Sequence, residues 1–351
     1  MNSEGRNSGN SRNEYYTRKM RTSGGDAEIK VPRDRNGEFQ SALLKKNSNE
    51  IEEKVIALYA KGMSTRDIQE LLTDLYGIDV SAETISAITD KVWPLVEAWQ
   101  NRPLAAVYAM VYLDAIHIKL KKDGKIANIA VYNVLGVDLD LEGHREILGH
   151  WVGDGAEGAN FWLSVVTDLQ TRGVQDLFIA AIDGLTGFKE AIQSVFPETK
   201  IQRCVIHQIR YSLKYVVWKD RKVFVSDLKT VYQAATREEA EANLQKLEQT
   251  WKDKYAAAVR SWQNNWDDLA TFFEFPQEIR RLIYTTNTVE GYHRQLRKVT
   301  KNKASFPTEQ AVRKLLYLAT MDITKKWTAP IRDWPLILNQ LAIRFEDRWP
   351  V

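Results

Sequence analysis

The spacing of apolar residues divides the chain into a helical beginning, a stretch with strand-like alternation and a helical end. Between residues 50 and 92 the apolar positions recur every three to four residues, in three short runs. Ser64 with Asp67 three residues later forms a capping box, and Ser81 is the N-cap of the next helix. Three short helices joined by tight turns predict a helix-turn-helix, although any small helical bundle carries the same signals.

Beyond Pro103 the period becomes two, which predicts strands. The first two predicted strands are joined by Asp123-Gly124, a strong hairpin turn. Helices and strands alternate after the third strand, and this order predicts a mixed α/β sheet. The predicted strands cover residues 107–120, 125–137, 145–152, 177–182 and 200–206, with helices at 159–170 and 187–195.

From His207 to Arg280 the pattern is helical throughout and dense in tryptophan, which predicts an all-helical insertion. Residues 285–318 then return to helices that pack on the sheet. The large apolar side chains of the insertion are expected in its core, namely Trp218, Trp251, Trp262 and Trp266.

The composition excludes several classes of protein. Of the 351 residues 44% are hydrophobic and 27% are charged, so the chain can bury a core and form two or three domains. A single cysteine rules out an internal disulfide framework and suits the cytoplasm. No apolar run approaches the roughly 18 residues of a membrane span. The formal net charge of +3 does not by itself indicate nucleic-acid binding, so the placement of the charges must decide.

Asp114 lies within the first predicted strand, on the face that alternation assigns to Met110, Tyr112 and Ile116. A carboxylate on such an apolar face needs a cation, a hydrogen-bond network or a metal ion, because burying it unpaired costs several kcal/mol. The alternative is an edge position at which the strand opens to solvent.

Two further carboxylates stand at positions that suit a site. Asp183 follows the buried strand predicted at 177–182, at the strand end where α/β sheets place ligands, although Asp183-Gly184 is also a common turn. Glu290 occupies the first turn of a late helix with Asn287 as its N-cap, and a plain capping box explains that spacing equally well.

Basic residues follow Glu290 at helical spacing, namely Arg294, Arg297, Lys298 and Lys301. An ion pair of Glu290 within this helix would contribute only about 0.3 to 0.5 kcal/mol, whereas a metal ligand beside a phosphate track requires the same arrangement. Three carboxylates from a strand, a strand end and a helix can meet at one edge of the sheet, where hard oxygen ligands select magnesium or manganese. Two such ions about 3.5 to 4 Å apart support phosphodiester displacement.

Several motifs, spread from about Tyr15 to Trp349, are specific in combination. They are Val111-Tyr112-Leu113-Asp114, Gly158-Ala159-Asn160-Phe161-Trp162, Ala181-Ile182-Asp183-Gly184, Cys204-Val205-Ile206-His207-Gln208-Ile209-Arg210, Tyr284-Thr285-Thr286-Asn287-Thr288-Val289-Glu290 and Arg294-Gln295-Leu296-Arg297-Lys298. Together they resemble the Mutator-like transposases of bacterial insertion sequences.

This resemblance implies an α/β ribonuclease-H-like catalytic domain with an Asp, Asp, Glu metal triad, which falls on Asp114, Asp183 and Glu290. It also implies a helical insertion between the second Asp and the Glu. The expected domains are a basic flexible arm at 1–48, a helix-turn-helix DNA-binding domain at 49–102, the catalytic domain at 103–206 and 282–330, the insertion at 207–281 and a C-terminal tail at 331–351.

The activity that the resemblance implies is hydrolysis of a strand at a transposon end, followed by attack of the freed 3′-hydroxyl on target DNA. The implied cofactor is magnesium or manganese, with two ions per active site. The implied partners are double-stranded DNA, as terminal inverted repeats and as target, and further copies of the chain in a homodimer or larger assembly. The expected location is the bacterial cytoplasm at the nucleoid, with no membrane partner.

Cys204 and His207 match the Cys-x-x-His element of the family. A structural zinc site would need further ligands than one cysteine and five histidines offer, so His207 is expected to orient a carboxylate or contact the scissile phosphate. The alternative is an ordinary core histidine. Arg210 and Lys214 begin a basic track for DNA or, alternatively, a solvated face, and one tryptophan of the insertion is a candidate to stack on a displaced base.

Two departures from the family pattern lead to a rival hypothesis. Members usually carry further residues before this N-terminus, which favours as the alternative function a catalytically inactive, truncated relative that acts as a sequence-specific DNA-binding repressor. Gly291-Tyr292-His293 stands where Ser-Leu-Asn is commoner, which leaves the triad unchanged but alters local contacts. A third class, a two-carboxylate glycosidase, does not explain the basic helix after Glu290.

Overall fold

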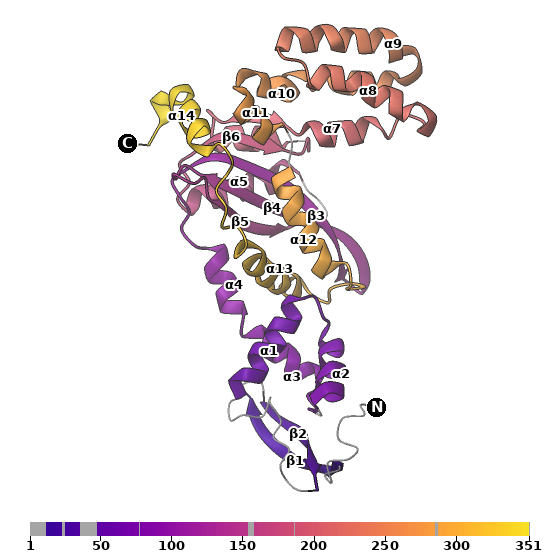
Figure 1. Cartoon of the computed structure of the whole chain (residues 1–351), viewed down its shortest axis with the longest axis vertical. Helices are drawn as coiled ribbons and strands as arrows, with labels where there is room; N and C mark the ends of the chain where they lie inside the picture. Colours follow the sequence, from indigo (N-terminus) through magenta and orange to yellow (C-terminus); the bar gives the residue numbers. More distant parts are fainter. Residues whose placement is uncertain are drawn as a thin grey trace. The chain divides into compact units, whose positions relative to one another are not determined.

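A computed structural model describes residues 12–22, 25–35, 48–76, 78–153, 158–185, 187–284 and 287–350 (Figure 1). The structure is mixed α/β, as the sequence predicts, and divides into two compact units. The first unit comprises residues 1–99, 118–127 and 295–323, and the second comprises 100–117, 128–294 and 324–351.

Three short helices of the first unit follow the predicted pattern. They are α1 (Ser48–Ala60), α2 (Thr65–Tyr76) and α3 (Ala82–Asp90). The backbone N–H of Asp67 donates to the Ser64 hydroxyl (3.1 Å) and the Ser64 N–H donates to the Asp67 carboxylate (2.9 Å), so the predicted capping box forms. The Ser81 hydroxyl accepts from the N–H of Thr84 at the start of α3, which confirms the predicted N-cap.

The first unit also contains α4 (Trp93–Gln100) and α13 (Glu309–Thr324). The sequence analysis missed α4, which follows α3 after a short turn and carries Pro94 in its first turn, where a helix tolerates proline. Helix α13 lies against α1, because the Tyr59 hydroxyl donates to the carbonyl of Ala311 (3.1 Å). The buried Lys314 of α13 donates to Thr89 of α3 (3.1 Å).

Residues 1–48, for which the sequence predicts a flexible arm, contain an antiparallel pair of strands, β1 (Arg12–Thr22) and β2 (Gly25–Asp34). The apolar pattern does not reveal this pair, because backbone hydrogen bonds join the strands of a ribbon without any need for alternation. Val31 of β2 is buried. Residues 1–11, 23–24 and 36–47 lie outside the described residues.

A five-stranded mixed sheet in the order β5-β4-β3-β6-β7 forms the centre of the second unit, and its hairpin tip at 118–127 belongs to the first (Figure 1). Strand β4 pairs antiparallel with β5, whereas β6 runs parallel to both β3 and β7. Asp123 and Gly124 both have positive φ (49° and 76°) and close the predicted hairpin between β3 and β4. The strands are β3 (Val107–Lys122), β4 (Lys125–Asp138), β5 (Arg145–Val152), β6 (Asp176–Ile182) and β7 (Lys200–Arg203).

Helices cover both faces of this sheet. On one face α5 (Ala159–Thr171) and α6 (Phe188–Val195) form an apolar core with the strands, in which Trp162 stacks on Phe188 at 4.1 Å between ring centroids. On the other face the Tyr112 hydroxyl of β3 donates to the carbonyl of Leu282 (3.0 Å) in α11. The sheet is therefore a rigid, buried support for side chains at its strand ends.

The segment after the sheet is helical throughout, as predicted. Strand β7 ends at Arg203 rather than at Ile206, because α7 begins directly after Cys204. No helix within the described ranges is both long and apolar enough to cross a membrane, and this includes the 27-residue α9. The segment contains α7 (Val205–Ser212), η1 (Trp218–Asp220), α8 (Arg221–Tyr232), α9 (Arg237–Gln263), α10 (Trp266–Ala270), η2 (Thr271–Glu274) and α11 (Gln277–Ile283).

Two of the tryptophans in this segment lie in its core, as expected, and one does not. Trp251 and Trp262 are buried, and the indole N–H of Trp262 donates to the hydroxyl of Ser212 (2.9 Å). Trp218, in η1, is 84% exposed, so it contributes little to the core.

The last part of the chain begins with α12 (Asn287–Thr300) and ends with α14 (Trp334–Arg344) and η3 (Glu346–Arg348). Residues 331–351, for which the sequence predicts a tail, are therefore largely helical. Trp334 is fully buried, and the ring of Phe345 stacks on Phe178 of β6 at 4.5 Å. The C-terminal segment is thus part of the second unit's core.

Candidate metal centre

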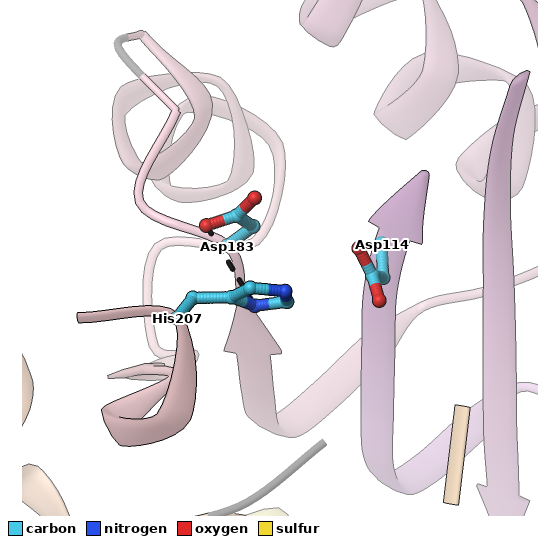
Figure 2. A group of neighbouring side chains, drawn as sticks. All are labelled: Asp114, Asp183 and His207. Carbon is cyan, nitrogen blue, oxygen red and sulfur yellow. Dashed lines mark ion pairs between the residues drawn. The ribbon is translucent and has the colours of Figure 1, made fainter. Parts of the chain in front are cut away.

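Asp114 within β3, Asp183 directly after β6 and His207 in the first turn of α7 come together, as Figure 2 shows. The parallel pairing of β3 with β6 sets Leu113 opposite Ile182. The next residue of each segment is an aspartate, so Asp114 and Asp183 lie side by side. His207 lies in the first turn of α7, which follows β7. One ligand atom from each residue lies within 4.8 Å of the others.

The carboxylate of Asp114 is nearly buried, with 9% of the side chain exposed. Its Oδ1 accepts a hydrogen bond from the backbone N–H of Ala115 (2.7 Å), and its Oδ2 lies 3.3 Å from Nδ1 of His293. Burial alone would raise the pKa of Asp114, but the hydrogen bond from His293 and the charge of His207 hold the pKa below its ordinary value. Asp114 is therefore ionised and available to a cation.

Asp183 is more open, with 35% of its side chain exposed. Its Oδ1 accepts from the N–H of Gly184 (2.8 Å), which is the turn contact that the sequence also suggests. Gly184 lets the guanidinium of Arg203 lie close to the backbone, because a Cβ there would lie 2.0 Å from the guanidinium carbon and the arginine would have to move. Arg203 is in turn fixed by a hydrogen bond to Asn265 (2.7 Å).

His207 faces Asp183, with Nδ1 3.8 Å from the carboxylate Oδ1. This Nδ1 is buried and has no hydrogen-bond partner within the described part of the chain. Burial lowers the pKa of His207, but a hydrogen bond with Cys204 and the charges of Cys204, Asp183 and Asp114 raise it to about 9. At 3.8 Å the two side chains form an ion pair without a hydrogen bond.

The three residues suit a divalent cation. Two carboxylates and an imidazole nitrogen are ligand types that bind first-row divalent metals, and carboxylates also suit magnesium. A buried ring nitrogen without a partner costs free energy unless something else occupies that position. The two aspartates fit a divalent cation, whereas the unpartnered Nδ1 of His207 would bind one only after losing the proton that its raised pKa retains.

Glu290 is not a member of this group. It lies in the first turn of α12, and its carboxylate accepts a hydrogen bond from Nη1 of Arg210 at 2.6 Å. Arg210 remains 57% exposed, so the pair is accessible to solvent. Thr285, Thr286 and the side chain of Asn287, its expected cap, lie outside the described residues.

A cavity of about 630 Å³ opens beside Asp183 and His207. Three cations line it, namely Arg203, Arg210 and Lys214. Guanidinium and ammonium groups converging beside a metal site are the arrangement that receives a phosphate. The other basic residues of the expected DNA contact are exposed on or just after α12, and they are Arg294, Arg297, Lys298 and Lys301.

The sequence analysis missed Arg203 and did not assign a role to His293. Arg203 is the last residue of β7, and nothing in its sequence context distinguishes it from a surface arginine. A signal for the surroundings of His293 was present, because Asn133 and His150 interrupt strand segments that are otherwise apolar. Both are buried in the sheet.

Comparison with known proteins identifies the family. The family described as "Transposase, Mutator family" matches residues 1–330. The chain belongs to the Mutator family of transposases. It is 43% identical to the transposase for insertion sequence element ISRM3 of Rhizobium meliloti over 328 residues, which are 92% of this chain and 80% of that relative. It is 38% identical over 342 residues to a probable insertion sequence transposase of Corynebacterium diphtheriae, covering 91% of this chain and 99% of the relative.

A solved structure, the Drosophila P element transposase strand transfer complex, is similar over 84% of this chain and 82% of its own, with 11% identity and a TM-score of 0.32. The motifs that resembled Mutator-like transposases thus gave the correct family. As a transposase of this family, the chain is an enzyme that cuts and joins DNA.

Proposed function

We propose that this transposase cuts one strand at each end of an insertion sequence and joins the freed 3′-hydroxyl to target DNA, with a divalent-metal centre built on Asp114, Asp183 and Glu290. The observation that carries the proposal is the convergence of Asp114, Asp183 and His207, which are far apart in the sequence. Apolar packing alone gives no reason for two carboxylates to approach each other, because like charges repel.

In this proposal Asp114 and Asp183 each contribute carboxylate oxygens to the metal ions, which are magnesium or manganese, two to a site. When bound, such ions supply activation of the attacking hydroxyl and stabilisation of the leaving oxygen. His207 orients the Asp183 carboxylate or contacts the scissile phosphate, and its unpartnered Nδ1 is the polar atom that makes either contact.

Glu290 completes the triad by leaving Arg210. The Arg210–Glu290 ion pair is solvent-accessible, and pairs of this kind contribute only about 0 to 1 kcal/mol, so exchanging it for a metal contact costs little. Once Glu290 turns away, Arg210 is free to pair with a phosphate in the cavity that it lines with Lys214. DNA and metal binding would then reinforce each other.

The proposed domain assignment follows the same logic. Residues 49–102 form a helix-turn-helix that binds DNA, residues 103–206 and 282–330 form a ribonuclease-H-like catalytic domain, and residues 207–281 are its helical insertion. An antiparallel meander followed by parallel strands in the order β5-β4-β3-β6-β7 supports the catalytic assignment. The DNA partners are the terminal inverted repeats and the target, and the enzyme works as a dimer or larger assembly on DNA.

The test is strand cleavage and joining on DNA that carries the element's own ends, with Mg²⁺ or Mn²⁺. We expect Asp114→Asn, Asp183→Asn and Glu290→Gln each to abolish both steps, and EDTA to do the same for the wild type. Asp123→Asn is the matched control, because Asp123 sits in a hairpin turn whose positive φ asparagine also adopts. Wild-type activity in all three carboxylate variants would refute the assignment.

The rival, a DNA-binding repressor without chemistry, gives a different result in the same assay. It predicts end-specific DNA binding that EDTA does not affect, together with no cleavage in any divalent ion. The two carboxylates that the parallel pairing of β3 with β6 brings together favour the enzyme.

A further inference from the structure

Four buried polar side chains form a chain of contacts to Asp114, and none of them lines the cavity beside Asp183 and His207. They are Tyr292, His150, Asn133 and His293, each 4% exposed or less. They come from three different elements, since Asn133 lies in β4, His150 in β5 and both other residues in α12. Buried polar groups of this kind persist only when their hydrogen bonds are made.

Short contacts join these residues in one line that ends on Asp114. The Tyr292 hydroxyl lies 3.4 Å from Nε2 of His150, and Nδ1 of His150 lies 2.7 Å from Oδ1 of Asn133. Nδ2 of Asn133 lies 3.0 Å from Nε2 of His293, whose Nδ1 lies 3.3 Å from Oδ2 of Asp114.

The direction of the hydrogen bonds that lead from His150 to Asp114 follows from one carbonyl. The side-chain nitrogen of Asn133 lies 3.1 Å from the backbone oxygen of Val131, which can only accept, so that atom is the amide NH₂ and not the oxygen. Its second hydrogen points to Nε2 of His293, which must therefore be the unprotonated nitrogen of that ring.

The protons on either side of Asn133 are then placed. With a bare Nε2, His293 carries its ring proton on Nδ1 and donates it to Asp114. On the far side, Oδ1 of Asn133 accepts from Nδ1 of His150, and Nε2 of His150 lies against the Tyr292 hydroxyl. The donors from His150 onward therefore all point toward Asp114.

We propose that Tyr292, His150, Asn133 and His293 form a relay, the Asp114 relay, that directs the Nδ1 proton of His293 at Asp114 and so fixes the Asp114 carboxylate for metal binding. The members of the Asp114 relay are positioning residues, since none of them contacts the reacting atoms. The inference rests on the proposed function only in its last clause, the role of Asp114 as a metal ligand.

Two features support a positioning role over a merely packed polar core. The two oxygens of Asp114 receive one donor each, from Ala115 and from His293, so the carboxylate cannot rotate without losing both, and each oxygen keeps a lone pair for a cation. Two of the relay residues also belong to α12, which carries Glu290 one turn before His293. The Asp114 relay therefore ties the helix of the third carboxylate to the strand of the first.

The first test reads the tautomer directly and needs no DNA. In the full chain with ¹⁵N-labelled histidine, we expect Nδ1 of His293 to be protonated and Nε2 to be bare, assigned by comparison with His293→Asn. In Asn133→Asp a carboxylate oxygen replaces the NH₂ donor, and we expect Nε2 of His293 to become protonated. A wild-type His293 protonated on Nε2, or an unchanged tautomer in Asn133→Asp, would overturn the relay. His144→Gln is the control, because that ring is exposed and outside the relay.

The second test uses two replacements that keep different halves of the imidazole. The amide nitrogen of asparagine is bonded to Cγ, as Nδ1 is, whereas that of glutamine is bonded to Cδ, as Nε2 is. We expect His293→Asn to keep the donor to Asp114 and to need nearly the wild-type Mn²⁺ concentration for half-maximal cleavage. His293→Gln should need about 10 to 100 times more, the usual effect of removing a group that orients a metal ligand.

Thermal unfolding of His293→Asn and His293→Gln separates loss of the donor to Asp114 from misfolding. Both variants replace the buried ring of His293 with an amide that fills its place incompletely, so their unfolding temperatures should be similar. Equal Mn²⁺ requirements in His293→Asn and His293→Gln would show that the donor to Asp114 does not matter, and would overturn the positioning role. Tyr292→Phe removes only the far end of the relay and should have the smallest effect. If Asp114→Asn cleaves like the wild type, the proposed function fails, while the tautomer result still decides the relay by itself.

Discussion

Arg210 donates a hydrogen bond to the carboxylate of Glu290 and also lines the cavity beside His207. Because the Arg210–Glu290 pair is exposed, we expect Arg210→Ala to change the free energy of unfolding by less than about 1 kcal/mol. The same change removes one phosphate contact, so the slope of log affinity for DNA against log salt concentration should fall by about 1. A salt titration of DNA binding measures this.

Arg237→Ala provides the control for Arg210→Ala. Arg237 is an ion-paired arginine of α9, held by Glu241 and Asp267, and it does not line the cavity. Its removal should leave the salt slope unchanged. An identical slope in wild type and Arg210→Ala would exclude Arg210 from the DNA contact.

The substitution Gly184→Ala tests whether strand cleavage requires the position that Arg203 takes beside the metal centre. Alanine at this position would place its Cβ within about 2 Å of the Arg203 guanidinium, so the flexible arginine must move and lose its hydrogen bond to Asn265. We expect Gly184→Ala to lower the rate of strand cleavage while the unfolding temperature changes little. Gly291→Ala is the matched control, because a Cβ there meets nothing within 4 Å. Equal cleavage rates in the two variants would contradict a role for Arg203.

The sequence predicted where single residues lie in their strands and helices, but it did not predict which residues they contact. The alternation of β3 correctly set Asp114 on the face shared with Tyr112, and the apolar run before Asp183 correctly indicated a buried strand. The contact of His293 with Asp114 depends on where α12 packs against β3, and no local pattern contains that information. The pairing of Glu290 with Arg210 depends in the same way on the packing of α12 against α7.

Among the helices of the insertion, two tryptophans with opposite environments separate stability from DNA binding. Trp262 is buried in α9, so Trp262→Ala should lower the free energy of unfolding by about 3 to 5 kcal/mol. Trp218 is 84% exposed, and Arg221 lies 5.7 Å from its ring centroid, so Trp218→Ala should cost no more than about 0.5 kcal/mol. Urea denaturation of both variants measures the two values.

The exposed ring of Trp218 is also free to stack on a base. If it does so at a transposon end, Trp218→Ala should weaken binding to DNA with an unpaired end by on the order of tenfold, since one stacked base contributes about 1 to 3 kcal/mol. Trp218→Phe keeps an aromatic face and should restore part of the affinity. Equal affinity of wild type and Trp218→Ala for such DNA would rule out stacking.

Element predictions succeeded where hydrophobic periodicity is strong and failed where other forces set the structure. The strands β3 to β6 and helices α5 and α6 matched closely, because each has one or two faces that pack into the core. The β1–β2 pair was missed because backbone hydrogen bonds define it, and the end of β7 was misplaced because apolar residues continue into α7. The helix α14 was missed, and its buried Trp334 shows that the C-terminal segment packs like a core element.

For the whole molecule, the near-balance of 49 basic and 46 acidic residues conceals an uneven distribution. Three cations line one cavity next to Asp183 and His207, so a phosphate meets a local field that the total charge does not reveal. Whether a phosphate binds beside these three cations also depends on the charge of Asp114 and Asp183. Without metal ions Asp114 and Asp183 repel a phosphate. Two divalent ions would reverse the local charge, so metal binding is expected to precede productive DNA binding.

Metal binding should therefore be visible in the stability of the full chain without DNA. A ligand that binds only the folded state at about 100 times its dissociation constant adds about 2.7 kcal/mol, which raises the unfolding midpoint by several degrees. We expect Mn²⁺ to produce such a rise in the wild type and in Asp123→Asn, EDTA to reverse it, and Asp183→Asn to abolish it by removing one of two carboxylates at the site. A rise of the same size in Asp183→Asn would mean that the ion binds elsewhere, and the convergence of Asp114, Asp183 and His207 would then need another explanation.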